Sequence, residues 1–337
     1  MIRRANTITD LASTHVNSSL LPLQVVGVYP NTTVDIYLRM APKATNTNVT
    51  FLGIVYYSGD VIRTDVGEYE ALQIECLGRC SLTGSLVASS KPVAVFSVSN
   101  MLSLEYVGSI GQDNFMEQMP PVEAYGHDFI VKQQPSRIHD QNYCNIISCE
   151  DFVWIVASEI NTTVRVSNDS TGAVYNHYID EAGQAIKLLM GGDIMQISSD
   201  NAVLVVQVLR TLSKNDGGML VVPPMAQYAS HDVIMFQPTT SSAQRQVVVY
   251  TDDRPAPAIE VDGTVHSSDG QLDGSLFNVS YWDITYTGGA NASTEVRVLY
   301  DGAFGGYVSD LGEAEKISSL AHGVDRINEV SLSLIHI

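Results

Sequence analysis

The chain contains nearly the same phrase twice, as MPPVEAYGHDFI at 119–130 and as VPPMAQYASHDVI at 222–234. Each phrase closes a series of blocks that share order and character. The blocks are NTTVDIYL at 31–38, GEYEALQI at 67–74 and SSKPVAVFSV at 89–98 in the first series, and NTTVRV at 161–166, GGDIMQI at 191–197 and SSDNAVLVVQV at 198–208 in the second. Four blocks in the same order indicate a tandem duplication of a unit of about 100 residues.

The blocks predict β-strands. VDIYL alternates between apolar and polar residues, whereas PVAVFSV and AVLVVQV are short continuous apolar runs, typical of strands inside a sandwich. Six or seven strands in each hundred residues predict an all-β fold of tandem antiparallel β-sandwich-like modules. A propeller-like radial arrangement is the alternative, although blades usually repeat every 40–50 residues. Helical periodicity is confined to 312–321, where a short terminal helix is predicted.

The Pro-Pro pair of each repeated phrase predicts a connection. Proline has no N–H to donate to a strand ladder, so each pair belongs at a sheet edge or in a crossover. We therefore expect each phrase to link one sheet to the next, with Tyr125 and Tyr228 packed behind the prolines.

The blocks also predict the domain organisation. A third, partial series begins at VVVYTDDRPAPAIEVDGT and closes with VRVLYDGAFGGYVSDLG. The last residues, SLSLIHI, continue no earlier pattern and resemble a translated adaptor sequence, so they are left out of the fold prediction. The predicted parts are a leading segment at 1–24, β module 1 at 25–135, β module 2 at 136–240, a partial β module 3 at 241–312 and a tail at 313–337, of which 331–337 is expected to be non-native.

Composition excludes several classes of function. Of the 337 residues 45% are hydrophobic and 16% charged, as in a globular protein. The net charge of -19, from 37 acidic and 18 basic residues, argues against nucleic acid as a partner. No run of 18 apolar residues occurs, so no membrane span is predicted.

Two features predict an extracellular protein. The first is the presence of seven Asn-x-Ser/Thr sequons, although the same residues also favour β-turns. The start of the chain has no apolar core of a signal peptide, so we expect a fragment of a secreted chain that lacks this peptide. The sequons, predicted to carry glycans, are Asn17, Asn31, Asn48, Asn161, Asn168, Asn278 and Asn291.

The second feature is the set of four cysteines, which occur as two close pairs. Cys76 and Cys80 are separated by three residues, and Cys144 and Cys149 by four. Two local disulfides are predicted. The alternatives are a zinc site built from all four cysteines, and free buried thiols.

Candidate catalytic and metal-binding residues are better explained by structure. His127-Asp128 and His231-Asp232 recur in the repeated phrases, but adjacent strand residues point to opposite faces unless a bulge intervenes, so a structural role is predicted. His139-Asp140 lies near Cys144, for which a disulfide is expected rather than a nucleophile. Calcium is an alternative for acidic loops that read more simply as hairpin turns, and these loops contain Asp252, Asp253, Asp262, Asp269 and Asp273.

Five ordered stretches across about 25–312 resemble the N-terminal domain of IgGFc-binding protein and its relatives. The stretches are NTTV, LTGSLVASSKPVAVFSVSN at 82–100, EQMPPVEAYGHDFIV at 117–131, WIVASEINTTVRV at 154–166 and LVVPPMAQYASHDVI at 220–234. The resemblance implies an extracellular β-rich recognition module, often joined to von Willebrand D-type and cysteine-rich domains in mucus or matrix glycoproteins. The cysteines that the family usually carries after PVAVFS are absent here, which leaves the binding surface unassigned.

The sequence therefore predicts an extracellular binding or adhesion module of a secreted mucus- or matrix-type glycoprotein, not an enzyme, with no cofactor. An extracellular protein or glycan is the expected partner, and some of the sixteen tyrosines are expected to contact it while most lie in the core or in cross-strand pairs. The alternatives are a polysaccharide hydrolase with an unrecognised carboxylate site, and a structural spacer. A pocket lined by paired carboxylates of shifted pKa, between modules, would favour the hydrolase.

Overall fold

The computed structural model describes the greater part of the chain, and its regular structure there is almost entirely β-strand. Two single 3-10 turns, η1 (Val122–Ala124) and η3 (Met225–Gln227), are the exceptions within the described residues. The all-β prediction is confirmed. The described residues are 3–6, 22–42, 47–77, 80–102, 113–133, 151–210, 217–236, 244–252, 258–261, 263–287, 295–310 and 320–322.

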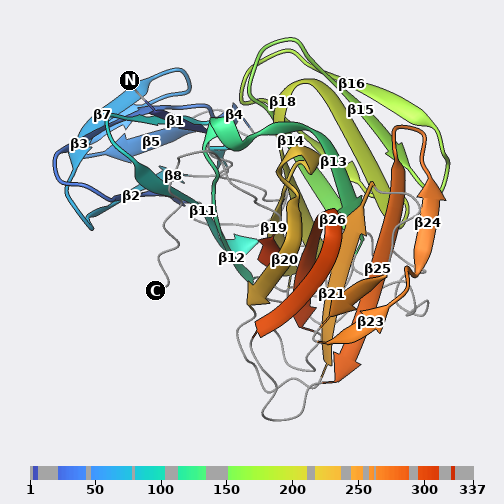
Figure 1. Ribbon diagram of the computed structural model, residues 1–337. Helices are drawn as coiled ribbons and strands as arrows, with labels where there is room; N and C mark the ends of the chain where they lie inside the picture. The colour runs from blue at the N-terminus through green and yellow to red at the C-terminus, as the bar shows by residue number, and fades with distance from the viewer. Residues whose placement is uncertain are drawn as a thin grey trace.

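Hydrogen-bonded sheets divide the strands into three sets, here called the first, second and third units (Figure 1). The first unit comprises β1 (Arg3–Asn6), β2 (Pro22–Gly27), β3 (Thr32–Tyr37), β4 (Ala41–Pro42), β5 (Asn48–Phe51), β6 (Ile54–Tyr56), β7 (Val61–Val66), β8 (Ala71–Leu77), β9 (Cys80–Ser81), β10 (Leu86–Ser89), β11 (Val93–Leu102) and β12 (Asp113–Gln118). The second comprises β13 (Gly126–Lys132), β14 (Phe152–Ala157), β15 (Thr162–Asn168), β16 (Val174–Ile179), β17 (Ala185–Leu189), β18 (Ile194–Arg210) and β19 (Gly217–Val222). The third comprises β20 (Ala229–Phe236), β21 (Gln244–Thr251), β22 (Ile259–Val261), β23 (Thr264–His266), β24 (Gly270–Asp273), β25 (Asn278–Thr287), β26 (Glu295–Asp310) and β27 (Leu320–His322).

The three units share one antiparallel pairing scheme. The first unit has the sheet orders β1-β10-β3-β7 and β12-β11-β2-β8-β5-β6. In the second unit the orders are β13-β18-β15-β16 and β19-β18-β14-β17, and in the third they are β20-β26-β22-β23 and β27-β26-β21-β25-β24. Strands β18 and β26 each replace the pair β10 and β11, because each runs from one sheet of its unit into the other.

The middle of β18 shows how one strand serves two sheets. Residues 194–199 pair with β13 and β15, whereas residues 203–210 pair with β14 and β19. In the first unit, Pro92 lies at this position and separates β10 from β11. Proline cannot donate to a ladder, so the corner there interrupts the strand.

Each unit buries its core between its two sheets. In the first unit Val34 and Ile36 of β3 contribute to one cluster with Leu23 and Val25 of β2, which belongs to the opposite sheet. The residues between them on β3 are less buried, so the alternation predicted from VDIYL is observed. Two antiparallel sheets around a shared core form a β-sandwich.

Other strands are apolar at nearly every position, rather than at alternate ones, because both of their faces are buried. On β14, Val153 and Ile155 face the core of the second unit, whereas Phe152 and Val156 belong to a cluster that includes Met119 from the first repeated phrase. The first and second units therefore meet across an apolar interface.

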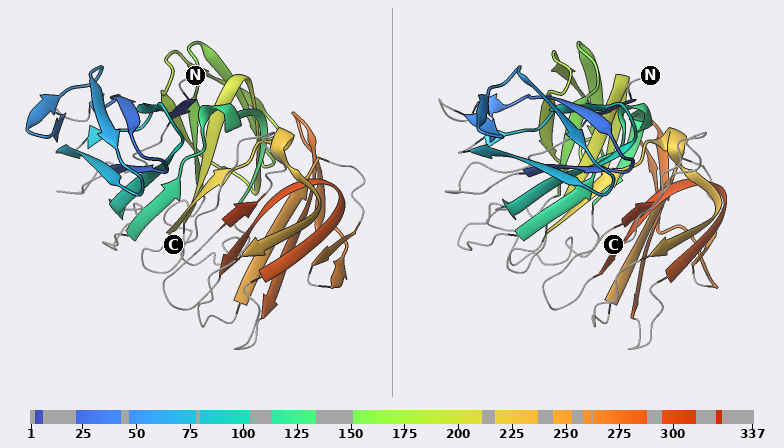
Figure 2. Two further views of the ribbon diagram at one scale, coloured as in Figure 1. Left: turned by 60° about the vertical axis from the view of Figure 1, so that its left-hand side comes forward. Right: turned by 90° about the vertical axis from the view of Figure 1, so that its left-hand side faces the viewer.

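A second apolar interface joins the second and third units. It contains Ile130 of β13 and Ile194 of β18 together with Val248, Tyr250 and Tyr307 of the third unit. The second unit accordingly lies between the other two (Figures 1 and 2). Interfaces of this apolar character are expected to hold the units in fixed positions.

The repeated phrases make the crossovers that the Pro-Pro pairs predict. One carries the chain from β12 to β13, and the other from β19 to β20, so each enters the sheet of the next unit. Both tyrosines are buried, Tyr125 at 7% and Tyr228 at 5% exposure. The phrases also touch, because Gln227 Nε2 donates a hydrogen bond of 2.8 Å to Ala124 O.

One feature of the block alignment is wrong. GEYEALQI forms β8, which pairs with β2, whereas GGDIMQI leads into the first half of β18, which pairs with β15. The strand of the second unit that occupies the place of β8 is β17, which pairs with β14. Two blocks with glycine and Gln-Ile are alike in sequence but lie in different sheets.

The remaining fold predictions have mixed outcomes. The units form no closed propeller, so that alternative is wrong. Most of the predicted terminal helix and all of 331–337 lie outside the described residues, and the end of the helix segment, Leu320 and Ala321, lies in β27.

The domain boundaries at 135 and 240 stay predictions. Strands β13 and β20, which precede these boundaries, pair with β18 and β26 after them.

Candidate functional site

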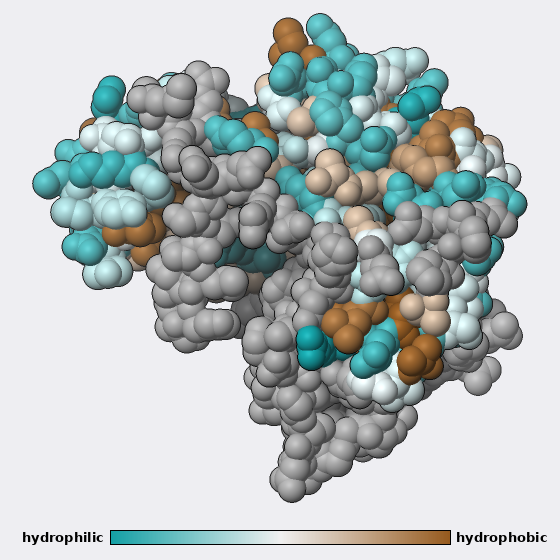
Figure 3. All heavy atoms as spheres, viewed as in Figure 1, coloured by the Kyte–Doolittle hydropathy of each residue, from teal (hydrophilic) through white to brown (hydrophobic). Residues whose placement is uncertain are grey.

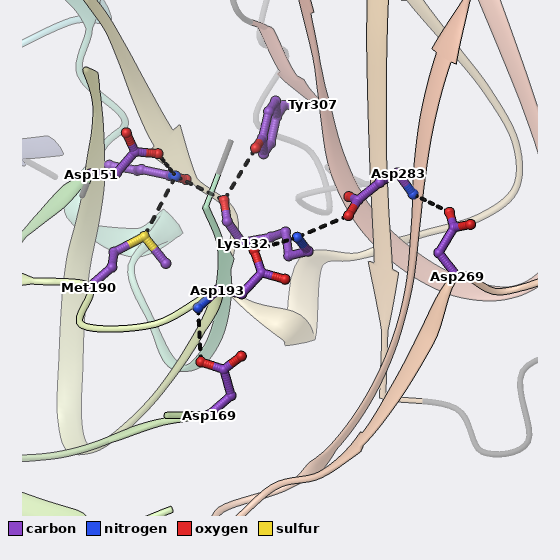
Figure 4. Close-up of polar contacts among 9 residues, drawn as sticks. Lys132, Asp151, Asp169, Met190, Asp193, Asp269, Asp283 and Tyr307 are labelled. Atoms are coloured by element: carbon purple, nitrogen blue, oxygen red, sulfur yellow. Dashed lines mark hydrogen bonds and ion pairs between the residues drawn. The ribbon is translucent and has the colours of Figure 1, made fainter. Parts of the chain in front are cut away.

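A buried ion-pair cluster lies at the interface of the second and third units (Figure 4). Lys132, at the end of β13, has no exposed surface. Its Nζ lies 2.7 Å from Asp193 Oδ1 and 3.0 Å from Asp283 Oδ2. Asp193 immediately precedes β18 and Asp283 lies in β25, so the ammonium joins two units. The same Nζ lies 4.8 Å from the ring centroid of Tyr281, at the distance of a cation–π contact.

The backbone of Lys132 is held from both units as well. Gln207 Nε2 of β18 donates 2.9 Å to Lys132 O and 3.0 Å to Asp151 Oδ2. Tyr307 Oη of β26 donates 3.2 Å to the same Lys132 O. These contacts hold the backbone carbonyl of Lys132 and so help to position the residue from which the side chain extends.

Two further aspartates accept hydrogen bonds from the backbone N–H groups of Asp193 and Asp283, the residues whose carboxylates bind Lys132. Asp193 N donates 2.9 Å to Asp169 Oδ1, and Asp283 N donates 2.6 Å to Asp269 Oδ2 (Figure 4). Asp269 therefore lies at the open end of the hairpin of β24 and β25, and the segment predicted to be a hairpin loop contains β24 itself.

Burial and charge act on the cluster in opposite directions. The pKa of Asp283 is raised to about 6, mainly by burial and in part by the neighbouring Asp193 and Asp269 carboxylates, against the attraction of Lys132. Burial lowers the pKa of Lys132, but the attraction of Asp283 and Asp193 outweighs it, so this pKa is raised. The three groups carry one net negative charge when all are ionised.

This cluster is best explained as a junction between units. It does place two carboxylates between units, one with a raised pKa, which is the feature expected of a hydrolase. However, both carboxylates bind an ammonium with no exposed surface, and the lysine backbone is bonded from both sides. Such a geometry fixes two surfaces together. Sequence reasoning missed it, since FIVK at 129–132 reads only as the end of a strand.

The His-Asp pairs lie where β13 and β20 enter their sheets. The register shifts between Gly126 and Asp128 and, in the second phrase, between Ser230 and His231. His127 Nδ1 lies 3.1 Å from Ser199 O, and Ser199 Oγ donates 3.2 Å to His127 O. These bonds tie β13 to the corner of β18, in agreement with a structural role. The side chains of His231 and Asp232 lie outside the described residues, as does all of His139-Asp140.

The acidic loops are dispersed. Asp252 and Asp273 are exposed, and Asp253 and Asp262 lie outside the described residues. In the part of the chain that the structure describes, no group of three or more His, Cys, Asp or Glu residues is arranged to hold a metal ion.

One of the four cysteines is described with its side chain. Cys76, on β8, is 1% exposed and disulfide-bonded, and its Sγ lies 3.6 Å from Met40 Sδ. The side chain of Cys80 and all of Cys144 and Cys149 lie outside the described residues, so the predicted pairing stays a prediction.

Five of the seven sequons are described. Asn31, Asn161 and Asn278 are exposed, and Asn48 is half-buried. Asn168 is half-buried too, and its Oδ1 accepts hydrogen bonds from Ser170 Oγ and from both Thr171 N and Thr171 Oγ1. Asn17 and Asn291 lie outside the described residues.

Exposed tyrosines gather in the first two units. Five tyrosines are buried, and these are Tyr125, Tyr228, Tyr250, Tyr300 and Tyr307. Six are at least 45% exposed, and these are Tyr29, Tyr37, Tyr57, Tyr69, Tyr175 and Tyr178. Of the exposed six, Tyr37, Tyr175 and Tyr178 lie in cross-strand pairs, opposite Val61, Val166 and Thr163. The other three lie outside the strands.

The first unit has one open edge rich in exposed apolar side chains, here called the β6–β7 edge and defined by Tyr37, Leu52, Ile54, Val55, Tyr57 and Val61. Strand β6 is the edge of one sheet and β7 is the edge of the other, and residues 57–60 connect them. Hydrophobic residues are visible on this unit in Figure 3. Exposed apolar edge strands are sites of association.

The β6–β7 edge belongs to an addition that the second unit lacks. Residues 38–60, between β3 and β7, form β4, β5 and β6, whereas only a short turn separates β15 from β16. The hairpin of β5 and β6 turns at Leu52, which has a φ of 49° and is 82% exposed. A large apolar side chain held exposed in a left-handed turn contributes nothing to the shared core, which indicates a role outside folding.

The fold thus defines an all-β protein of repeated two-sheet units. A model of the IgGFc binding protein family matches residues 6–309, so the chain belongs to this family. The resemblance predicted from the sequence blocks is confirmed. No curated protein and no solved structure shows significant similarity to the chain. Membership of the family supports an extracellular binding module. In the described part of the chain no helix has the length and apolar character needed to cross a membrane.

Proposed function

We propose that the chain is a binding module of a secreted mucus- or matrix-type glycoprotein, and that it recognises an extracellular protein through the β6–β7 edge. The observation that carries the proposal is the addition at 38–60, which extends the first unit and exposes Leu52, Ile54 and Tyr57. The shared sandwich does not need these side chains, since the second unit forms without an equivalent.

The chemistry of this edge suits a protein partner. Tyrosine provides large contact area at low entropic cost, and Tyr37 lies opposite Val61 on paired strands. The edge strands also offer backbone groups to which an extended segment can add. Rigid apolar junctions between the three units would hold this edge at one end of a stiff chain, as a recognition surface requires.

Predicted local disulfides and N-glycans are part of this proposal, as is the absence of catalysis. The cluster around Lys132 supports a non-catalytic role, because its carboxylates bind a buried ammonium. IgG Fc is the ligand to test first, since the family is described by that partner.

Surface plasmon resonance against immobilised IgG Fc tests the proposal. The wild-type chain is expected to bind saturably, and the double variant Ile54→Ser, Tyr57→Ser is expected to lose at least tenfold in affinity. Val265→Ser is the matched control, because Val265 is 69% exposed on the third unit. Equal binding by wild type and the double variant would contradict the assignment of the edge, and no saturable binding would contradict Fc as the ligand.

A further inference from the structure

Two sequons occupy equivalent turns in the first and second units. Residues 28–31 connect β2 to β3, and residues 158–161 connect β14 to β15. Asn31 has a φ of 53° and Asn161 a φ of 55°, and both side chains are exposed. Asparagine tolerates this left-handed conformation better than most residues. The repeat thus presents two asparagine amides from the same backbone geometry.

The next residue closes each turn in the same way. Thr32 Oγ1 donates 2.7 Å to Tyr29 O, and Thr162 Oγ1 donates 2.9 Å to Glu159 O. Both turns are therefore fixed by one hydrogen bond from the same position. Any difference in how glycans at the two sequons contact the protein must therefore come from neighbouring side chains rather than from the backbone of the turn.

The turns differ at both residues before each asparagine, which are Tyr29-Pro30 in the first and Glu159-Ile160 in the second, and the aromatic ring is the difference that can contact a sugar. The first turn has Tyr29, which is 49% exposed, and the second has Glu159. A second exposed ring is near the first turn, since Tyr69 is 77% exposed and its N donates 2.8 Å to Gly27 O at the end of β2. The second turn has no aromatic residue within 158–163.

We propose that the exposed ring of Tyr29 is a platform for the first sugar of an N-glycan on Asn31. One face of an N-acetylglucosamine ring presents axial C–H bonds, which carry partial positive charge and pack against the electron-rich face of an aromatic ring. Tyr29 and Asn31 are both exposed and lie two positions apart in a turn fixed by the Thr32 hydrogen bond, so a contact between the ring and the sugar would cost little ordering entropy. The glycan on Asn161 has no such platform.

The modification itself is ordinary N-glycosylation. Asn31 Nδ2 forms a bond to C1 of a sugar supplied by a lipid-diphosphate-linked oligosaccharide, the lipid diphosphate leaves, and the amide loses one proton. The inference rests on the proposed function, because a chain meets this donor only in a secretory pathway.

A double-mutant cycle on the full chain from secretory cells tests the inference. Aspartate also tolerates the left-handed region, so Asn31→Asp removes the glycan with little effect on the turn. We expect Asn31→Asp to lower Tm by about 2 °C or more in the wild type and to have no effect with Tyr29→Ser. Asn161→Asp is the matched control and is expected to leave Tm unchanged.

Two further variants keep the inference falsifiable if Tyr29→Ser folds poorly. Tyr29→Phe retains the ring and is expected to retain the coupling with Asn31, and Glu159→Tyr is expected to create the same coupling at Asn161. Additive effects of Tyr29 and Asn31, or an unoccupied Asn31, would overturn the inference. Glycans at other sequons would then leave the proposed function intact, whereas a chain with no glycans at all would contradict both.

Discussion

The ammonium of Lys132 lies 3.0 Å from Asp283 Oδ2, and this ion pair crosses the boundary between the second and third units. Lys132 arrives there because the first repeated phrase carries the chain out of the first unit and into β13. The same crossover that links two sheets therefore also supplies the charged group at the next junction.

Replacing the lysine alone is expected to be costly. Lys132→Met leaves the carboxylates of Asp193 and Asp283 without their shared cation in a mostly buried site, so we expect a loss of about 3 kcal/mol in the free energy of unfolding. Urea denaturation at pH 7.5 measures the loss.

The compensated variant distinguishes charge from packing. Lys132→Met combined with Asp193→Asn and Asp283→Asn removes all three charges, and it is expected to recover most of the stability lost by the single change. If the triple variant were no more stable than Lys132→Met, the lost contacts rather than the unpaired charges would account for the effect.

Stability is expected to depend on pH through Asp283. Its pKa is about 6 in the folded chain and near 3.8 when unfolded, so the folded chain binds the extra proton between these values. The wild type should therefore gain stability relative to Asp283→Asn as the pH falls from 7.5 to 5, by about 1 kcal/mol, because pH 5 lies one pH unit below the folded pKa.

The main physical reason is the burial of Asp283, and the net negative charge of the cluster adds to it. Protonation leaves Lys132 paired with Asp193 alone, which is neutral overall. Asp283 Oδ1, which is buried and has no hydrogen-bond partner among the described residues, is the oxygen on which the proton is expected. Chemical denaturation of both chains across this range measures the difference, and parallel pH profiles would contradict the assignment.

A glycine pair at the contact of the first and second units gives another test. A Cβ on Gly84 would lie 1.8 Å from Gly183 O, next to the Arg39 side chain that donates 3.2 Å to the same oxygen. Gly84→Ala is therefore expected to destabilise the chain by about 2 kcal/mol more than Gly53→Ala.

Gly53 is the matched control because its φ of 79° is close to the 84° of Gly84, whereas no atom lies within 4 Å of a Cβ placed there. Both substitutions cost backbone strain, and only Gly84→Ala adds a clash between units. Equal shifts in Tm would show that the close approach of Gly84 and Gly183 is dispensable.

The sequence predicts local structure and connections well. The continuous run AVLVVQV predicts a strand inside a sandwich, and β18 confirms this. Its Val203 and Val205 pack in the core of the second unit, whereas Leu204 and Val206 belong to the cluster that includes Met119. The Pro-Pro pairs predict crossovers because proline lacks a donor, and both crossovers are observed.

The sequence predicts pairing and junctions less well. Short blocks with glycine and Gln-Ile do not encode which strand they pair with, which explains the misplaced equivalence of β8 and β18. The partners of Lys132 lie 61 and 151 positions further along the chain, at Asp193 and Asp283, and only the packing of units brings them together. An apolar edge such as that of β6 reads in sequence like any core strand.

Non-reducing peptide mapping of the full chain, purified from a secretory host, tests the central claim most directly, because it reports disulfides and glycans in one measurement. The account predicts peptides joined by Cys76–Cys80 and by Cys144–Cys149, together with glycans on the exposed residues Asn31, Asn161 and Asn278. Free thiols at all four cysteines and unmodified asparagines at all seven sequons would contradict an extracellular binding module.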